Sequence, residues 1–219
     1  SQISCGRLPL LIQETPLKVI CLTGGLASGK STAVKHLATK GAVVIDADIL
    51  GHQAYNPGTA AFDEVITSFG EEVRGGDGQI DRKALGGKVF GKPEALRKLT
   101  DIVWPEIRRL AELELAAIAD SNSEAIVVLE AAVLFEAGWE DIGEEIWVLT
   151  VDRETAIERS MARDKAPRDA VERRLDSQLS NEVRTSRADV VITNDDSVAR
   201  MLAQIDSAYA ESTGSSGAR

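Results

Sequence analysis

The sequence predicts an α/β fold in which helices flank a five-stranded parallel sheet. Two observations support this class: short aliphatic runs alternate with helix-like stretches, and a glycine-rich loop follows the first run. Runs that are apolar at every position are typical of strands covered on both faces. Parallel neighbours need crossover connections, which the helical stretches provide. The expected strands are 18–22, 42–45, 125–129, 146–151 and 190–193.

The loop after the first strand matches a phosphate-binding pattern. Residues 24–31 (GGLASGKS) fit G-x-x-x-x-G-K-[ST], in which backbone N–H groups surround phosphates, the lysine reaches the β- and γ-phosphates, and the hydroxyl ligates Mg²⁺. A helix is expected over 31–39, and its N-terminus adds to the anion site. We therefore expect nucleotide binding, with a simple glycine turn as the alternative. The predicted nucleotide-binding residues are Gly24, Gly25, Leu26, Ala27, Ser28, Gly29, Lys30, Ser31 and Thr32, with Ser31 on Mg²⁺.

Two aspartates follow the second strand. Asp46 and Asp48 lie on the same side if the strand continues. Ligands bind at the carboxyl ends of strands in such sheets, and transfer to a hydroxyl needs a carboxylate that accepts its proton. We predict this role for Asp48, and for Asp46 a place in the site, where it would hold Mg²⁺ through water. The alternative is an Asx turn with Asp48 as a helix N-cap. His52 is a candidate substrate contact, although a lone histidine is more often structural.

The second and third strands are separated by a long helical insertion, residues 51–123. On a sheet of this kind such an insertion is typical of a substrate-binding lobe, and a helical cover for one sheet face is the alternative. Pro93 and Pro105 are expected in the first turns of helices.

Two glutamates near the third strand are further candidates. Glu130 ends the strand and is a candidate for holding the waters of Mg²⁺; a surface cap or part of the substrate wall are the alternatives. Glu136 is a candidate of similar standing for substrate contact.

Residues 153–187 contain eight arginines. Arg159 and Arg163 are four apart, so they share one face of a predicted helix, and we expect them to contact phosphate. For Arg173, Arg174 and Arg184 we expect a solvated helix face paired with nearby acidic residues.

Composition limits the possible partners and the domain count. The chain has 219 residues and a net charge of −10, which argues against nonspecific binding to nucleic acid or anionic membranes. Cys5 and Cys21 are too few for a disulfide framework, so a reducing compartment is expected. We expect a single domain over 17–211, between a flexible N-terminal extension (1–16) and a flexible tail (212–219).

Seven segments form an ordered set of motifs: LTGGLASGKST (22–32), VIDADILGHQAYNPG (44–58), DGQIDRKALGGKVFG (77–91), LTDIVWPEI (99–107), LEAAVLFEAGWE (129–140), ERSMARD (158–164) and RADVVITND (187–195). This set resembles the dephospho-coenzyme A kinase family, and most closely the kinase domain of the animal bifunctional coenzyme A synthase. The likeness covers about residues 18–208. Two departures from many bacterial members, Trp104-Pro105 and Ala132-Val133-Leu134, agree with the animal form.

The resemblance implies a P-loop kinase fold with a helical substrate-binding lobe (51–123) and a lid (153–187). It implies that the γ-phosphate of ATP moves to the ribose 3′-hydroxyl of dephospho-CoA, which gives CoA and ADP in the last step of coenzyme A biosynthesis. The roles that it implies are Asp48, Lys30, Arg159 and Arg163 in catalysis, Arg82 as a cation on the substrate side, and Asn194 at the adenine site.

Two other functions stay open from the sequence: another small-molecule P-loop kinase, or a non-catalytic nucleotide-dependent regulatory module. The guanine-recognition signature Asn-Lys-x-Asp is absent, since the segment 193–196 (TNDD) has no lysine. We expect a monomer, or a domain of a larger coenzyme A synthase, that binds neither nucleic acid nor membranes. The expected compartment is the cytoplasm, with the mitochondrion as the alternative.

Overall fold

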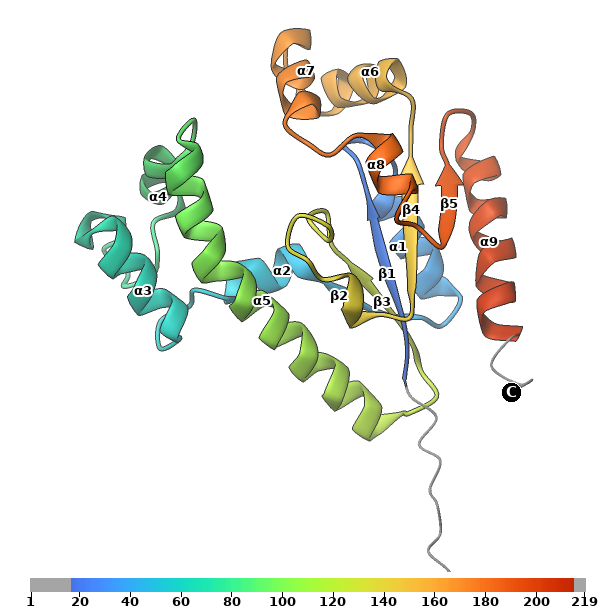
Figure 1. Cartoon of the computed structure of the whole chain (residues 1–219), viewed down its shortest axis with the longest axis horizontal. Coiled ribbons are helices and arrows are strands. Elements are labelled where there is room, and N and C mark those ends of the chain that lie inside the picture. The colour runs from blue at the N-terminus through green and yellow to red at the C-terminus, as the bar shows by residue number, and fades with distance from the viewer. Residues whose placement is uncertain (1–16, 215–219) are drawn as a thin grey trace, which may run out of the picture.

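A five-stranded parallel sheet forms the centre of the molecule, in the strand order β2-β3-β1-β4-β5 (Figure 1). The structure is a computed structural model that describes residues 17–214. The predicted fold class is confirmed, and each strand begins and ends within two residues of the expected position. The strands are β1 (Lys18–Gly24), β2 (Val43–Asp46), β3 (Ile126–Glu130), β4 (Glu145–Thr150) and β5 (Val190–Thr193).

Helices connect the strands in the order that the sequence predicts. Those before β3 are α1 (Lys30–Thr39), α2 (Ala47–Gln53), α3 (Ala60–Phe69), α4 (Arg82–Val89) and α5 (Pro93–Ser121), with a 3₁₀ turn at Glu71–Val73. After β3 come a 3₁₀ turn at Glu140–Ile142 and the helices α6 (Arg153–Asp164), α7 (Arg168–Asp176), α8 (Asn181–Thr185) and α9 (Val198–Gly214).

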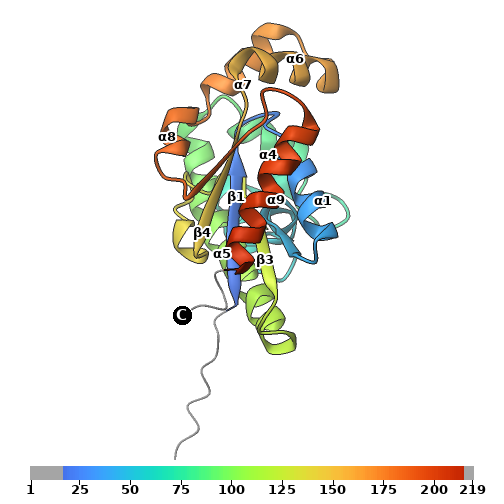
Figure 2. The same cartoon turned by 90° about the vertical axis from the view of Figure 1, so that its right-hand side faces the viewer.

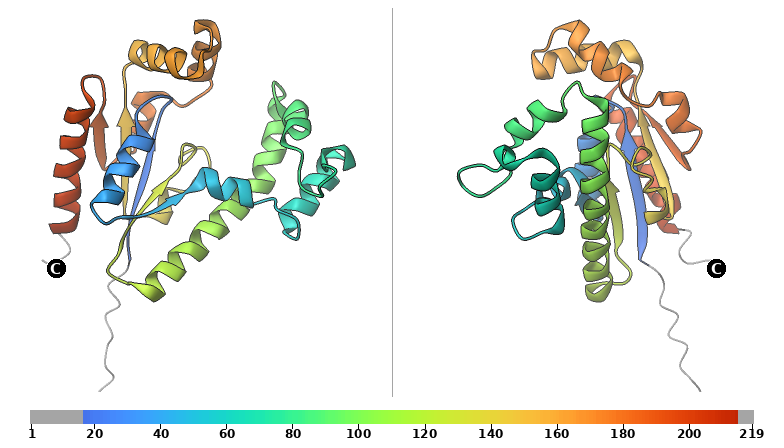
Figure 3. Two further views of the ribbon diagram at one scale, coloured as in Figure 1. Left: turned by 180° about the vertical axis from the view of Figure 1, so that it is seen from behind. Right: turned by 60° about the vertical axis from the view of Figure 1, so that its left-hand side comes forward.

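The sheet is covered on both faces, as continuous apolar strands require. Ile20 and Leu22 of β1 pack against α1 and α9, which lie side by side on one face (Figure 2 and Figure 3). Val19 and Cys21 alternate with them and face the opposite core, which includes residues of α5. Burial of both side-chain sets fixes the register, because a slip of one residue would exchange the two faces.

The register brings the carboxyl ends of three strands together. Glu130 of β3 lies beside Leu22 of β1 on one side and beside Asp46 of β2 on the other. The loop after β1, the acidic end of β2 and Glu130 therefore share one edge of the sheet, where ligands bind in folds of this type.

Helices α2 to α5 extend to one side of the sheet (Figure 1 and Figure 3), with α2, α3 and α4 all packed on α5. Pro93 begins α5, as predicted, but the prediction for Pro105 was wrong because α5 continues through it. A proline inside a helix removes one hydrogen bond, and local sequence therefore favours a helix end. Ile102, Val103 and Ile107 are buried on either side of Pro105, so packing outweighs that loss.

Helices α6 and α7 pack on each other above the carboxyl end of β4 (Figure 1). A small apolar cluster, formed by Leu26 of the loop after β1, Ile157 of α6 and Val171 of α7, joins them to that loop. The side chain of Asp152 caps α6 by accepting a hydrogen bond from the N–H of Thr155. Among residues 17–214, no helix has the length and apolar character needed to cross a lipid bilayer.

The edge strand β5 is joined to α9 by one side chain. The Oε1 atom of Gln204 accepts a hydrogen bond from Thr193 N at 3.0 Å, and its Nε2 atom donates to Thr193 O at 2.9 Å. The side-chain amide of Gln204 thus hydrogen-bonds both the backbone N–H and the backbone C=O of Thr193.

The start of β1, the start of β4 and the end of α9 meet at the amino ends of the strands. Lys18 Nζ lies 2.8 Å from Glu145 Oε1 and donates to Ser212 O at 2.6 Å. Glu145 Oε2 also accepts hydrogen bonds from Trp147 Nε1 and Ser212 Oγ. The predicted tail was therefore wrong for residues 212–214, which continue α9 and include the buried Ser212; residues 1–16 and 215–219 lie outside the described residues.

We expect Glu145→Gln to destabilise the protein by about 2–3 kcal/mol, because it removes a charge-assisted contact to Lys18 in a half-buried setting. Burial raises the pKa of Glu145, but hydrogen bonds from Lys18, Ser212 and Trp147 outweigh burial and lower the pKa below its usual value. The stabilisation is thus complete above the unfolded-state pKa of about 4.3 and is lost as the pH falls through the lower folded-state pKa.

Urea unfolding at pH 7 and at lower pH values measures this effect. The exposed neighbour Glu144 provides the control, since Glu144→Gln is expected to change stability by less than about 0.5 kcal/mol. Equal losses in the two variants, or a deficit that does not shrink in acid, would contradict the prediction.

Candidate active site

The glycine-rich loop (residues 24–32) connects β1 to α1, as the motif requires. A Cβ atom at Gly24 would lie 2.4 Å from Leu149 O, and one at Gly29 would lie 2.6 Å from Asn194 Nδ2. Gly29 also has a φ of 97°, in the left-handed region that favours glycine. Both glycines are therefore required by close packing around the loop, and the frame that the sequence predicts for phosphate binding is present.

Lys30 is half-buried at the start of α1, with its ammonium group turned back onto the loop. Its Nζ atom donates to Gly24 O at 2.9 Å and to Gly25 O at 3.2 Å. Burial lowers the pKa of Lys30, and the negative charge of Glu130 opposes this shift. The loop thus holds a cation where phosphate oxygens would meet the helix N-terminus.

Asp46 has a structural role that the sequence prediction assigned differently. The strand does not continue to Asp48: Asp46 is the N-cap of α2, and its Oδ1 atom accepts from the N–H groups of Asp48 at 2.8 Å and Ile49 at 3.2 Å. The condition for a shared strand face is therefore not met, because a capping aspartate turns the chain into a helix at once. Asp48 is exposed in the first turn of α2 and does not serve as the cap.

Three carboxylates gather near Lys30. Burial and the charges of Asp46 and Asp48 raise the pKa of Glu130, while Lys30 opposes the shift. Within residues 17–214, no group of three or more histidine, cysteine or acidic side chains could bind a metal by itself. Mg²⁺ binds through one or two carboxylates, waters and substrate phosphates, so these carboxylates and the exposed Ser31 fit that ion.

Arg159 and Arg163 of α6 face the phosphate loop, in agreement with their spacing. Together with residues 27–32 they line a cavity of about 330 Å³. The Nη1 atom of Arg159 is buried without a hydrogen-bond partner in the described part of the chain, whereas Arg163 forms an ion pair with Asp164. A half-buried guanidinium whose buried donor has no partner, beside a phosphate loop, is suited to an anionic ligand.

A second cavity, of about 500 Å³, opens between α2 and α5. Asp48 and His52 line it on α2, and Trp104 and Trp139 pack edge to face with ring centroids 6.5 Å apart. Arg82 lies nearby, since its Nη2 atom donates to His52 O at 3.4 Å. Asp48 therefore belongs both to this lobe cavity and to the charged group around Lys30.

Arg184 was not identified from the sequence as a residue of the site, and the prediction that this side chain lies on a solvated helix face was wrong. The charged Arg184 is 2% exposed, whereas the apolar Val183 beside it is 42% exposed. This is the reverse of the burial that the two side chains suggest. The Nη2 atom of Arg184 lies 3.8 Å from Glu136 Oε1, so Glu136 is beside Arg184. Glu136 is not among the residues that line the lobe cavity. No local pattern in the sequence indicates this burial.

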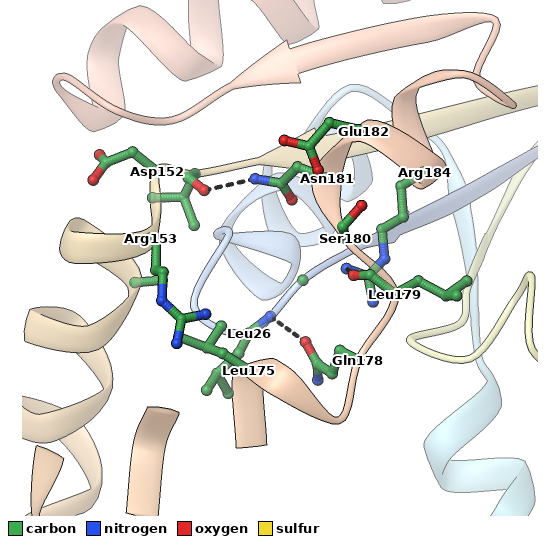
Figure 4. Close-up of a pocket in the computed structure, with 13 residues that line it drawn as sticks. Leu26, Asp152, Arg153, Leu175, Gln178, Leu179, Ser180, Asn181, Glu182 and Arg184 are labelled. Carbon is green, nitrogen blue, oxygen red and sulfur yellow. Dashed lines mark hydrogen bonds between the residues drawn. The ribbon is translucent and has the colours of Figure 1, made fainter. Parts of the chain in front are cut away.

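A third cavity, of about 350 Å³, lies around Arg184 (Figure 4). The Oε1 atom of Gln178 accepts from Leu26 N at 3.0 Å, and Asn181 Nδ2 donates to Val151 O at 2.9 Å. Gln178 and Asn181 are two more residues that the sequence reasoning missed.

Asn194 is buried beneath the phosphate loop. Its Nδ2 atom donates to Ser28 O at 2.9 Å, so the side chain supports the loop from behind. Contact between Asn194 and an adenine ring stays a prediction.

Comparison with known proteins gives a consistent result. The family model described as dephospho-CoA kinase matches residues 18–200. A curated relative from Geobacter sulfurreducens, named dephospho-CoA kinase, is 44% identical over 195 residues, which cover 89% of this chain and 98% of the relative. The relative of the same name from Symbiobacterium thermophilum is 38% identical, with 92% of this chain and 84% of the relative covered.

Solved structures agree with this result. TT1252 from Thermus thermophilus has a TM-score of 0.76 and 32% identity, with 90% of this chain and 98% of that chain covered. A dephospho-CoA kinase from Campylobacter jejuni has a TM-score of 0.60 and 27% identity, with coverage of 89% and 97%. These four proteins are bacterial, so the expected closer likeness to the animal form rests on the sequence motifs alone.

Proposed function

Because the chain belongs to the dephospho-CoA kinase family, we propose that it transfers the γ-phosphate of ATP to the ribose 3′-hydroxyl of dephospho-CoA, with Asp48 beside that hydroxyl. The family catalyses the last step of coenzyme A biosynthesis, and the chain is accordingly a P-loop transferase. The observation that carries the assignment of Asp48 is its position. It is exposed, it lines the lobe cavity, and its charge acts on Lys30 of the phosphate loop.

We further propose that residues 24–32 bind the ATP phosphates. Lys30 neutralises charge on the β- and γ-phosphates, and Arg159 and Arg163 approach the transferred group from α6. The cavity that these residues share and the free donor of Arg159 support this assignment. Phosphoryl transfer passes through a loose transition state, so positioning and charge neutralisation supply most of the catalysis.

The acceptor is proposed to bind in the lobe formed by residues 51–123, with residues 153–187 as a lid over the nucleotide, all within a single domain (17–211). His52 lines the lobe cavity. Arg82 lies next to it, where it donates to His52 O and lies over the ring of Tyr55 at 5.9 Å. Arg82 is exposed, so it can meet an anionic part of the acceptor. Asn194 and Glu136 are proposed to act indirectly, through Ser28 and Arg184 respectively.

Magnesium is proposed as the ion that accompanies ATP. Ser31 would hold it directly, and Asp46 and Glu130 would hold it through water. When bound, the ion neutralises charge on the β- and γ-phosphates. Burial, and after it the negative charges of Asp46 and Asp48, raises the pKa of Glu130, so the ion would neutralise carboxylates that lie near one another at this end of the strands.

The enzyme is also proposed to act as a monomer in the cytoplasm. The reducing compartment expected from the cysteine content supports this location, and burial raises the pKa of the Cys21 thiol to about 12, which keeps it unreactive. Light scattering on the purified chain measures the first property, and fractionation of cells measures the second.

An ADP-release assay tests the proposed reaction. With ATP and Mg²⁺, we expect dephospho-CoA to release one ADP per CoA formed, and gluconate and adenosine monophosphate to release little. Removal of Mg²⁺ with EDTA should abolish release, and added Mg²⁺ should restore it. ADP release with another acceptor but not with dephospho-CoA would overturn the proposal, as would phosphate found on a hydroxyl other than the ribose 3′ position.

A further inference from the structure

A buried, incompletely paired cation lies against the phosphate loop. The Nη1 atom of Arg184, on α8, lies 3.4 Å from the position that a Cβ atom would take on Gly25. Nη1 donates to Leu179 O, but Nε is buried without a partner among residues 17–214. The carboxylate of Glu136 is 3.8 Å away and partly exposed. Burial of a charge with so little compensation is costly for stability, so a functional reason is expected.

The charge of Arg184 acts on the site. It lowers the pKa of Lys30, in the same direction as burial, so the two cations repel each other across the loop. Burial also lowers the pKa of Arg184, with Glu136 opposing it. Two fixed cations that repel each other in the free enzyme stabilise the negative charge of a bound phosphate. Such preorganised charge is most effective where water is excluded.

The segment that carries Arg184 also holds the loop backbone. Gln178 precedes α8 and binds Leu26 N, the peptide next to Gly25. Asn181 joins the same segment to Val151, at the point where the chain leaves β4 toward α6 (Figure 4). The chain that returns from α7 therefore binds the Leu26 peptide through Gln178 and places the guanidinium of Arg184 beside Gly25.

We propose that Arg184 is a positioning residue for phosphoryl transfer, which lies beside Gly25 of the phosphate loop and adds a fixed positive charge behind Lys30, while Gln178 fixes the adjacent peptide. This proposal rests on the proposed function and extends it to residues that do not line the nucleotide or lobe cavities. The carboxylate of Glu136, 3.8 Å from Nη2, partly balances the charge of the guanidinium.

Arg184→Met, Arg184→Lys and the matched control Arg187→Met test the proposal. Arg187 lies on the same segment and pairs with Glu140 and the ring of Phe135, but it is 41% exposed and not part of the cavity around Arg184. We expect kcat of Arg184→Met to fall at least about tenfold, since it loses preorganised charge, with KM for dephospho-CoA within about twofold of wild type. Arg184→Lys should recover part of kcat, and Arg187→Met should resemble the wild type.

The Arg184→Lys variant separates an electrostatic role from a structural one. Lysine keeps the positive charge but lacks the planar guanidinium, so a kcat above that of Arg184→Met reports the contribution of the charge. An equal loss of kcat in the two variants would overturn the electrostatic part of the proposal.

Circular dichroism and thermal unfolding check that each variant is folded. A folded Arg184→Met with wild-type kcat would overturn the proposal, as would Arg187→Met losing as much activity. Should Arg184→Met not fold, Gln178→Met decides: a severalfold fall in kcat supports the proposal, and wild-type kcat overturns it. A wild-type enzyme inactive on dephospho-CoA would instead contradict the proposed function.

Discussion

Replacement of Asp48 by asparagine will lower kcat by about 10²–10⁴-fold, the usual contribution of a positioned general base. The affinity for ATP should stay within about twofold, because Asp48 lines the lobe cavity and not the cavity of the phosphate loop. Asparagine has the same shape but cannot accept the proton of the acceptor hydroxyl. ADP release measures kcat, and isothermal titration calorimetry with ATP measures binding.

A control on another helix makes the Asp48 result specific. Asp101→Asn changes an exposed aspartate on α5 and should have wild-type activity. Near-normal turnover in Asp48→Asn would remove Asp48 from the proposed role.

Lys30→Met has the second large expected effect. We expect ATP affinity to fall at least about tenfold and kcat/KM by about 10²–10³-fold or more, because the variant loses the cation at the centre of the loop. Lys35→Met is the matched control on the same helix, where the lysine is exposed, and it should retain both properties. Calorimetry with ATP and ADP release give the two values. Unchanged ATP affinity in Lys30→Met would contradict the assignment of the loop.

Local patterns in the sequence were sufficient for the framework of the site. The strands β1 to β5 follow from aliphatic runs, and the phosphate loop follows from glycines whose positions leave no room for a side chain. Arg159 and Arg163 could be predicted because helical spacing alone places them on one face, and the structure brings both to the loop.

What could not be predicted depends on contacts between distant segments. Asp46 and Asp48 would share one side only if the strand continued, and the capping preference of Asp46 ended it. Pro105 suggested a helix boundary that burial of α5 overrides. Arg184 is enclosed by residues 25, 136 and 179, and no helical or strand spacing near residue 184 indicates such neighbours.

The amide of Gln204 has a consequence for the enzyme at high concentration. An exposed edge strand is a template on which another chain can add, and this is a common start of aggregation. At Thr193, an added strand would have to displace both hydrogen bonds that the Gln204 side chain makes. Helix α9 thus protects Thr193, the last residue of β5, against pairing with another chain, because the Gln204 side chain takes the place of a neighbouring strand.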